Sequence, residues 1–276
     1  MKGFVLTIVS LLFLSLIFTM ATTLHNHYLS MERSLAVPQP LSYASYSIGS
    51  AAVSLNSILG PDLSLNADNA TLDMAIIDTV PMRNVSGELS DYSALLQGGL
   101  ANQTHASIAA NLSNVSDGSY SLLINRRYTY SNAMDGEMVF SAVSGGTNAS
   151  EYEVTISVLQ ERMNITHFNF SASGDINLTL TYTDRNGTII EQGTVSSSSV
   201  DRFQVIYAGG GSLEVGVGRA SAHDGSLWVT AQDIVAETGI HAVLPPPSEN
   251  DRVGYEYDVP MDYRIGGAEV SRRIGT

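Results

Sequence analysis

A long uncharged stretch near the N-terminus constrains this chain more than any other feature. Residues Phe4 to Leu24 are twenty-one consecutive positions without a charged side chain. At about 1.5 Å of rise per residue, a helix of this length spans about 30 Å, which is the hydrocarbon thickness of a bilayer. Core helices of soluble proteins rarely run this far without a charge, so the segment predicts a transmembrane helix.

The flanks of this segment predict its orientation. Lys2 and the α-amino group precede it, whereas the far side begins with His25 and carries no full positive charge before Arg33. Positive flanking charge favours the cytoplasmic side of a membrane. We therefore expect a single-pass protein of the cell membrane, with the lipid bilayer as the partner of Phe4–Leu24 and with residues 25–276 outside the cell.

Three fates of the N-terminus remain open. The length of the uncharged stretch favours an anchor that is not cleaved. A secretory signal cleaved after Ala21 is the second alternative, because Thr19-Met20-Ala21 is a site of small residues, although only two residues precede the apolar region. The third alternative is cleavage after Gly3.

Cleavage after Gly3 is suggested by a resemblance to a known family. Met1-Lys2-Gly3-Phe4, followed directly by a hydrophobic helix, resembles the short leader of archaeal type IV pilin-like proteins, which are cut after a Lys-Gly or Arg-Gly pair. The resemblance covers only residues 1–30, and Ile8 stands where many pilins carry a Glu. It implies a filament subunit whose helix packs from Phe4 into a filament core, with self-assembly or other surface proteins as partners.

Composition excludes several functional classes. The net charge is -14, and phosphate binding needs clustered Lys and Arg, so nucleic acid is not an expected partner. The chain has no cysteine, which removes disulfides, cysteine-zinc sites and thiol nucleophiles together. Absence of disulfides also favours a prokaryotic surface and a domain that is held together by packing.

The motif Asn-x-Ser/Thr, the acceptor sequon for N-linked glycan, is unusually frequent. It occurs ten times among sixteen asparagines, whereas chance supplies roughly three from this content of Ser and Thr. We expect glycosylation of an exported chain, which supports the outside orientation independently of the charge rule. The expected acceptors are Asn69, Asn84, Asn102, Asn111, Asn114, Asn148, Asn164, Asn169, Asn177 and Asn186.

Sequon positions agree with the expected strands. In residues 176–183, a period of two places Ile176, Leu178 and the next alternate residues on one face. Asn177 then lies on the opposite face, toward solvent. Asn169 lies opposite its two neighbouring phenylalanines in the same way. A glycan acceptor must be exposed, and both strands permit this.

From residue 119 the hydrophobic period becomes two, which predicts a β-rich domain. Asp184-Arg185-Asn186-Gly187, the triplet Gly209–Gly211 and the pair Asp224-Gly225 are expected to form turns. Closely spaced strands with such turns predict an antiparallel sandwich or a jelly-roll-like module. The expected strands are 119–129, 137–144, 152–160, 164–172, 175–183, 187–195, 202–208, 212–218 and 226–231.

The region before residue 119 is expected to be mixed, with helices at 42–59 and 88–110 and a strand at Leu72–Val80. The predicted class is therefore α+β: a transmembrane helix with a stalk that Pro38 and Pro40 end, short helices, and then the β domain. The expected segments are 1–3 as cytoplasmic N-terminus or leader, 4–24 in the membrane, 25–40 as stalk, 41–118 as mixed region, 119–244 as β-rich extracellular domain and 245–276 as C-terminal tail or edge-strand segment.

A search for catalytic and cofactor motifs predicts no catalytic residue, no cofactor site and no metal site. The chain lacks GxGxxG, GxSxG, Walker A and HExxH patterns. Ser221-Ala222-His223-Asp224 is interpreted as a turn, because a nucleophilic triad assembles in space rather than along four residues. Asp184–Gly187 is interpreted as a hairpin, because the remaining ligands of a calcium loop are missing.

Three functions follow from these observations. The first is a membrane-anchored, N-glycosylated extracellular structural or interaction protein that is not an enzyme, with a pilin-like filament subunit as its sharpest version. The second is a membrane-tethered module that binds carbohydrate or an ion, for which Trp228, Tyr255, Tyr257 and Tyr263 offer aromatic faces. The third is an extracellular hydrolase, which no motif supports.

Overall fold

The structure is a computed structural model that describes residues 38–104, 107–143, 147–220, 223–247, 253–265 and 268–275. The chain divides into two units, Met1–Ser47 and Ile48–Thr276. The predictions for the leader, for Phe4–Leu24 and for residues 25–37 of the stalk lie outside the described residues. Among the helices that the structure describes, none combines the length and the hydropathy needed to cross a bilayer.

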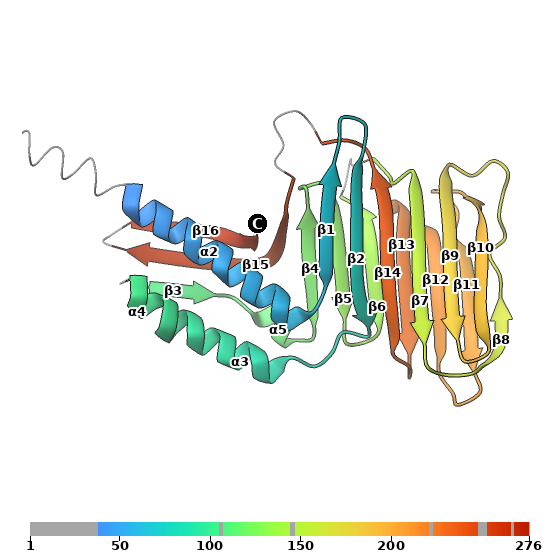
Figure 1. The fold of residues 1–276 in the computed structure, drawn as a ribbon, viewed down its shortest axis with the longest axis horizontal. Helices are drawn as coiled ribbons and strands as arrows, with labels where there is room; N and C mark the ends of the chain where they lie inside the picture. Colours follow the sequence, from blue (N-terminus) through green and yellow to red (C-terminus); the bar gives the residue numbers. More distant parts are fainter. Residues whose placement is uncertain are drawn as a thin grey trace, which may run out of the picture. The chain divides into compact units, whose positions relative to one another are not determined.

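Two sheets form most of the second unit (Figure 1). The six-stranded sheet has the order β1-β2-β14-β7-β9-β10. Its strands are antiparallel except for the parallel pair β7 and β9. The bounds are β1 Asp62–Ala67, β2 Leu72–Val80, β7 Glu151–Val158, β9 Ile176–Asp184, β10 Gly187–Val195 and β14 Ala236–Leu244.

The ten-stranded sheet has the order β16-β15-β4-β5-β6-β13-β12-β11-β8, with β3 paired to β15. All of its pairs are antiparallel. The bounds are β3 Ser107–Ala110, β4 Ser119–Ile124, β5 Tyr128–Ala133, β6 Glu137–Ala142, β8 Arg162–Thr166, β11 Asp201–Tyr207, β12 Ser212–Ala220, β13 His223–Gln232, β15 Tyr255–Ile265 and β16 Ala268–Gly275.

Period-two sequence patterns explain how the sheets face each other. Along β9, buried and more exposed side chains alternate, with Ile176, Leu178, Leu180 and Tyr182 buried. β7 alternates just as strictly. The buried faces of both sheets form one core, so the prediction of a β-rich domain made of sandwich-like antiparallel sheets is confirmed.

Tyrosine supplies seven of the twelve largest fully buried side chains of this core. Burial of so many hydroxyls requires hydrogen-bond partners, because an unpaired buried polar group is costly. Tyr152 of β7, for example, donates to the carbonyl of Gly225 in β13 at 2.8 Å and so joins the two sheets. Burial raises the pKa of Tyr152 above its ordinary value. The fully buried tyrosines are Tyr128, Tyr130, Tyr152, Tyr182, Tyr207, Tyr257 and Tyr263.

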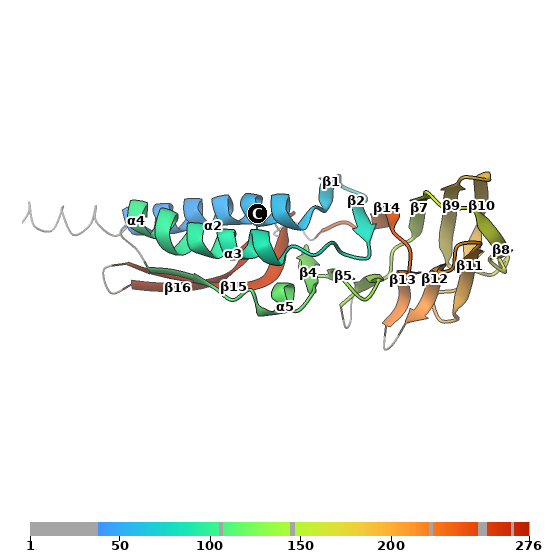
Figure 2. The same cartoon turned by 90° about the horizontal axis from the view of Figure 1, so that it is seen from below.

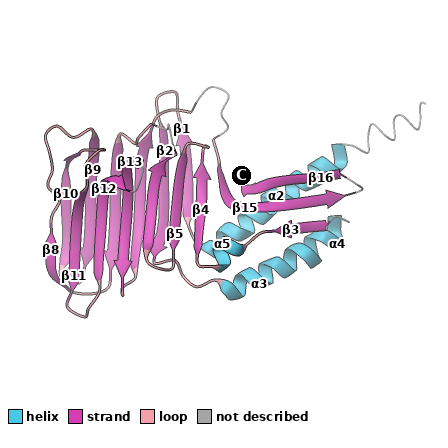
Figure 3. Ribbon diagram, turned by 180° about the vertical axis from the view of Figure 1, so that it is seen from behind, coloured by secondary structure: helices cyan, strands magenta, loops and turns pink. Residues whose placement is uncertain are grey.

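Helices in the second unit lie beside β3, β4 and β15, away from β8 to β12 (Figures 2 and 3). Tyr92 donates to the carbonyl of Ala51 at 3.0 Å, and Tyr257 donates to Oδ1 of Asn56 at 2.5 Å. These bonds tie the end of α2 to α3 and to β15. The helices are α2 Pro38–Leu59, α3 Ser86–Ala94, the π-helix η1 Leu95–Leu100, α4 Ala101–Thr104 and α5 Ser113–Ser116.

Several expected element boundaries were wrong. α2 begins at Pro38 instead of following a stalk that Pro38 and Pro40 end, and proline is compatible with a first helical turn, where its missing N–H has no partner to lose. The helix expected at 88–110 ends at Thr104, and residues 107–110 form β3. The strand expected at 164–172 ends at Thr166.

The β-strand predictions also missed one hairpin and the strands β1, β3 and β14. The strand expected at 119–129 is two strands, β4 and β5, joined by a turn in which Asn125 and Arg126 have positive φ. Asp224 and Gly225 lie within β13 rather than in a turn. The strands β1 and β14 were not expected, and β15 and β16 occupy the segment that was interpreted as a tail or an edge-strand segment.

Candidate functional site

The ten sequon asparagines lie at the surface of the described structure. Nine are exposed and Asn148 is half-buried, so none is in the core. Asn164 and Asn177 are on strands β8 and β9, and Asn102 and Asn114 are on helices α4 and α5. The others lie between elements: Asn69 after β1, Asn84 after β2, Asn111 before α5, Asn148 before β7, Asn169 after β8 and Asn186 between β9 and β10.

Asparagines outside sequons behave differently. Among the four that the structure describes, Asn125 and Asn132 are buried, Asn56 is half-buried and only Asn66 is exposed. This fold therefore buries asparagine readily when the residue is not in a sequon. The exposure of the sequon asparagines is therefore not shared by most of the other described asparagines, and an acceptor for N-linked sugar must be exposed.

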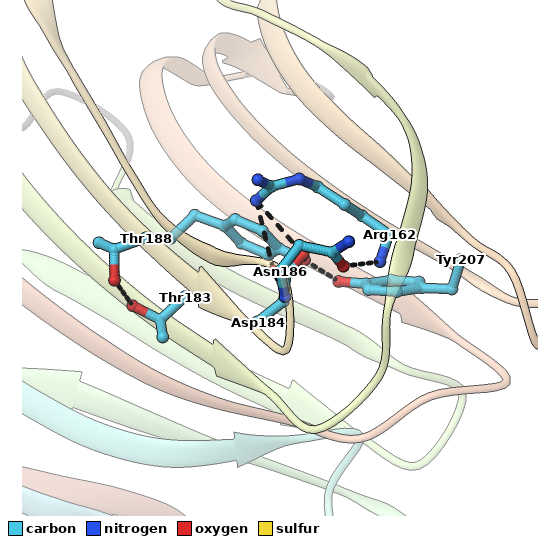
Figure 4. Close-up of polar contacts among 7 residues, drawn as sticks. Arg162, Thr183, Asp184, Asn186, Thr188 and Tyr207 are labelled. Atoms are coloured by element: carbon cyan, nitrogen blue, oxygen red, sulfur yellow. Dashed lines mark hydrogen bonds and ion pairs between the residues drawn. The ribbon is translucent and has the colours of Figure 1, made fainter.

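Asn186 shows how a sequon is built into this fold (Figure 4). It lies in the β9–β10 turn, where Asp184 pairs with Gly187 and Gly187 adopts a positive φ of 119°. Its backbone N–H donates to Oδ1 of Asp184 at 2.8 Å, and its Oδ1 accepts from the N–H of Arg162 at 3.0 Å. These bonds leave Nδ2, the atom that carries an N-linked sugar, without a partner among the described residues.

A buried carboxylate holds this turn in place. Asp184 accepts from Nη1 of Arg162 at 3.3 Å and from the hydroxyl of Tyr182 at 2.9 Å. The hydroxyls of Tyr182 and Tyr207 are 3.0 Å apart, which continues the network to β11. Burial raises the pKa of Tyr182, and it raises the pKa of Tyr207 to about 12. The Asp-Arg-Asn-Gly turn is thus fixed to β8 by a charge-assisted hydrogen bond from Arg162, and it is linked to β11 through the hydroxyls of Tyr182 and Tyr207.

Asn148 differs from the other acceptors because its side chain packs against the chain. A Cβ placed on Gly225 would come within 2.5 Å of Cγ of Asn148, so the carboxamide lies directly on the glycine backbone. Attaching a sugar to Nδ2 would disturb this packing. We expect Asn148 to be the least occupied of the ten acceptors.

A second buried carboxylate, Asp78 of β2, was not predicted. It accepts from the hydroxyls of Tyr120 and Tyr130, the latter at 2.6 Å, and from Nδ2 of Asn132 at 2.8 Å. All three donors come from β4 and β5 of the facing sheet. The sequence did contain a signal for this site, because Asp78 follows Leu72, Met74 and Ile76 at the same period of two and therefore occupies a core-facing position.

An open cleft of about 1010 Å³ lies where several strands end, near Pro81, the β5–β6 turn and the β13–β14 connection. Its apolar lining includes Met134, Leu159 and Val235, all strongly exposed. Oε1 of Gln160 is buried beside the cleft without a donor among the described residues. The carboxylates in the lining, which form no ion pair within the described residues, are Asp135, Asp233 and Glu237.

The aromatic residues considered for ligand binding lie mostly in the interior. Trp228 is buried, and its Nε1 donates to Oε1 of Glu214 at 3.1 Å. Tyr257 and Tyr263 are fully buried, and Tyr255 is half-buried. No aromatic residue lines the cleft. Within the described part of the chain, no three His, Cys, Asp or Glu side chains are grouped closely enough to hold a metal ion.

Comparison with known proteins adds no relative. No protein-family model matches the chain, and neither the curated proteins nor the solved structures contain a significant match.

Proposed function

We propose that this chain is a membrane-anchored, N-glycosylated protein of the cell surface whose β-sandwich is a structural or interaction module. The proposal depends mainly on one observation, the different burial of asparagines inside and outside sequons. Nine of the ten sequon asparagines are exposed, and the two asparagines that are buried among the described residues lie outside sequons. A surface that presents many acceptors is suited to an exported chain. The uncharged stretch Phe4–Leu24 supports anchoring by one helix.

Protease treatment of intact cells tests the location. We expect an added protease to remove the region after residue 38 from intact cells, because the sandwich is proposed to face outward. An epitope placed before Phe4 should remain protected unless the leader is cleaved. A chain that is digested only after cell lysis would contradict the proposal.

A pilin-like filament subunit is the finer version of this proposal. It is supported by the resemblance of Met1-Lys2-Gly3-Phe4 to an archaeal pilin-like leader. N-terminal sequencing of the mature protein separates the three fates. Phe4 as first residue supports the filament subunit, Met1 supports an uncleaved anchor, and Thr22 indicates a cleaved secretory signal. The last two results each contradict a pilin-like subunit.

The cleft supports a second candidate, a module that binds an extended cationic ligand. The cleft combines three carboxylates that form no ion pair within the described residues, a buried amide oxygen without a donor there, and an exposed aliphatic rim. These features favour a cation with apolar segments over a sugar, which stacks on aromatic rings. Calorimetric titration with spermidine tests this candidate. We expect Asp233→Asn combined with Glu237→Gln to abolish binding, and the outward-facing Asp73→Asn to leave it unchanged. Absence of binding to the parent protein would reject the candidate.

A further inference from the structure

Both sheets of the sandwich end in free edges. The six-stranded sheet ends in β1 and β10, and the ten-stranded sheet ends in β16 and β8. The edge of a sheet presents N–H and C=O groups that are able to pair with another chain, and natural proteins shorten, interrupt or cover such edges. The four edges at the ends of the two sheets, and the four-residue edge of β3, which pairs with β15 alone and is followed by Asn111, differ in how far they are protected in this way.

Two edges are short and flanked by acceptor sequons. β8 has five residues, contains Asn164, and shows a register shift where it meets β11 at Ile206 and Tyr207. β1 has six residues, follows Pro61 and ends shortly before Asn69. Glycans at these asparagines would stand beside both edges and hinder pairing with another strand.

The third edge, β10, is longer but covered at both ends. Asn186 directly precedes its first residue, Gly187. Near its other end, the carbonyl of Thr194 accepts from the N–H of Ser171 at 2.9 Å, so a neighbouring loop already uses part of the edge.

β16 is less protected than these edges, although its pairing with β15 also shows a register shift, between Glu256 and Pro260. It has eight residues, contains no proline or lysine, and pairs with β15 alone. No sequon lies within β16 or follows Asn186 in the sequence. Among the edges that the structure describes, β16 is therefore the one without an acceptor sequon within it or close to it in the sequence.

We propose that β16 pairs with β16 of a second copy of this chain in an antiparallel, two-fold symmetric ladder that continues the ten-stranded sheet from one copy into the other. This inference rests on the proposed function, because glycans are what set the other edges apart. The pairing uses the same edge on both copies, so it closes at a dimer and does not propagate into a fibre.

Charge on β16 specifies one register for this pairing. Glu269, Ser271 and Arg273 alternate along the strand and are all exposed. If Ser271 lies opposite Ser271 of the second copy, antiparallel geometry places Glu269 opposite Arg273 of that copy, and the two-fold axis repeats the pair. Opposite charges in facing positions favour a register, and like charges oppose it.

Neighbouring ion pairs extend this pattern. Within one copy, Arg264 contacts Glu269 at 2.7 Å, and Arg273 contacts Asp258 at 3.2 Å. In the proposed register, charges of alternating sign would run from Arg264 and Glu269 of one copy to Arg273 and Asp258 of the other. The edge is thus complementary to itself in charge as well as in backbone hydrogen bonding.

Disulfide trapping tests the pairing directly, because the chain contains no cysteine. Facing residues of an antiparallel ladder have Cα atoms about 4.5–5.5 Å apart, within the range that a disulfide spans. We expect the full-length Ser271→Cys variant in detergent to give a disulfide-linked species of twice the monomer mass after mild oxidation. Ser64→Cys, an exposed serine on the β1 edge, is the matched control and should remain monomeric.

Charge exchange in the Ser271→Cys background tests the register. Adding Arg273→Glu places like charges opposite each other twice, so the yield of linked dimer should fall. Adding Glu269→Arg as well should restore the yield, although both intrachain pairs are then between like charges. If Arg273→Glu lowered the yield only by disturbing ion pairs within one copy, adding Glu269→Arg would lower the yield of linked dimer further. Circular dichroism of each variant checks that the fold is retained.

The outcomes separate this inference from the proposed function when glycopeptides are mapped on the same preparation. Occupied sequons with no more linked dimer from Ser271→Cys than from Ser64→Cys would overturn the pairing alone. Unmodified sequons with efficient linking would overturn the glycoprotein proposal and leave the pairing in place. The proposed register is supported if Ser271→Cys gives linked dimer, if Arg273→Glu lowers the yield of that dimer, and if the further substitution Glu269→Arg restores it.

Discussion

The two buried aspartates of the six-stranded sheet, Asp78 and Asp184, differ in the partners that satisfy their carboxylates. Each is 8% exposed, and each accepts hydrogen bonds from the facing sheet or its edge. Asp184 has a cationic partner in Arg162. Asp78 forms no ion pair within the described residues, and its Oδ2 accepts instead from two tyrosines and Asn132.

The difference shows what each site contributes to the fold. A buried charge must be paired or fully hydrogen-bonded, and three aligned neutral donors satisfy that requirement as an arginine does. The Asp78 site lies where both sheets cover it, so its donors have no access to water if the acceptor is removed. Arg162 is partly exposed, so water can replace part of what it contributes. We therefore expect the Asp78 site to be the more sensitive one.

The largest effect is expected from Asp78→Ala. The substitution leaves the hydroxyls of Tyr120 and Tyr130 and the amide of Asn132 without their acceptor, and each unsatisfied buried donor is costly. The free energy of unfolding should fall by about 4 kcal/mol. Urea unfolding of the full chain in detergent, followed by the fluorescence of Trp228, measures this loss.

Asp73→Ala is the control for this substitution. Asp73 lies on the same strand but faces outward and is half-exposed, so the change should stay within about 0.5 kcal/mol. If the two substitutions lowered stability equally, the Asp78 cluster would have no special role in joining the sheets.

A smaller effect is expected from Arg162→Met. The carboxylate of Asp184 keeps the hydroxyl of Tyr182 and the N–H of Asn186 as donors, so stability should fall by about 2 kcal/mol. The same urea experiment measures the change. Arg202→Met, which removes a more exposed ion pair with Glu214, should cost about 0.5 kcal/mol or less. If Arg162→Met lowered the free energy of unfolding as much as Asp78→Ala or more, the expected order of the two sites would be wrong.

The smallest effect on stability is expected from Tyr207→Phe, and it is expected only at alkaline pH. Burial raises the pKa of Tyr207 from the ordinary value of 10.0 to about 12, so the unfolded chain releases this proton first as pH rises. The stabilisation is fully present below pH 10 and is lost as pH rises toward 12. Tyr207→Phe should therefore lose less stability between pH 10 and 12 than the parent chain. Identical pH profiles would show that Tyr207 does not contribute to alkaline unfolding.

Local sequence patterns predicted the parts of the fold that depend on local physics. β2, β9 and β10 were expected within a residue or two, because a strict period of two and the Asp-Arg-Asn-Gly turn determine them. The β4–β5 hairpin was missed because its turn uses Asn125 and Arg126 at positive φ without a glycine. For residues 245–276 the sequence left a tail and an edge-strand segment as alternatives, because β15 is stabilised by distant partners in β3 and β4.

The candidate sites divide in the same manner. The sequons are local motifs, and strand alternation already placed Asn177 toward solvent. The Asp78 cluster brings residues together over more than forty positions, so only its core-facing position was visible in the sequence. The cleft is formed by turns from both sheets and leaves no periodic signal.

Glycopeptide mass spectrometry of the protein from its native membrane tests the central claim most directly. We predict sugar on the exposed acceptors, including Asn177 and Asn186, and the lowest occupancy at half-buried Asn148. Native protein in which all ten sequon asparagines carry no modification would contradict the account.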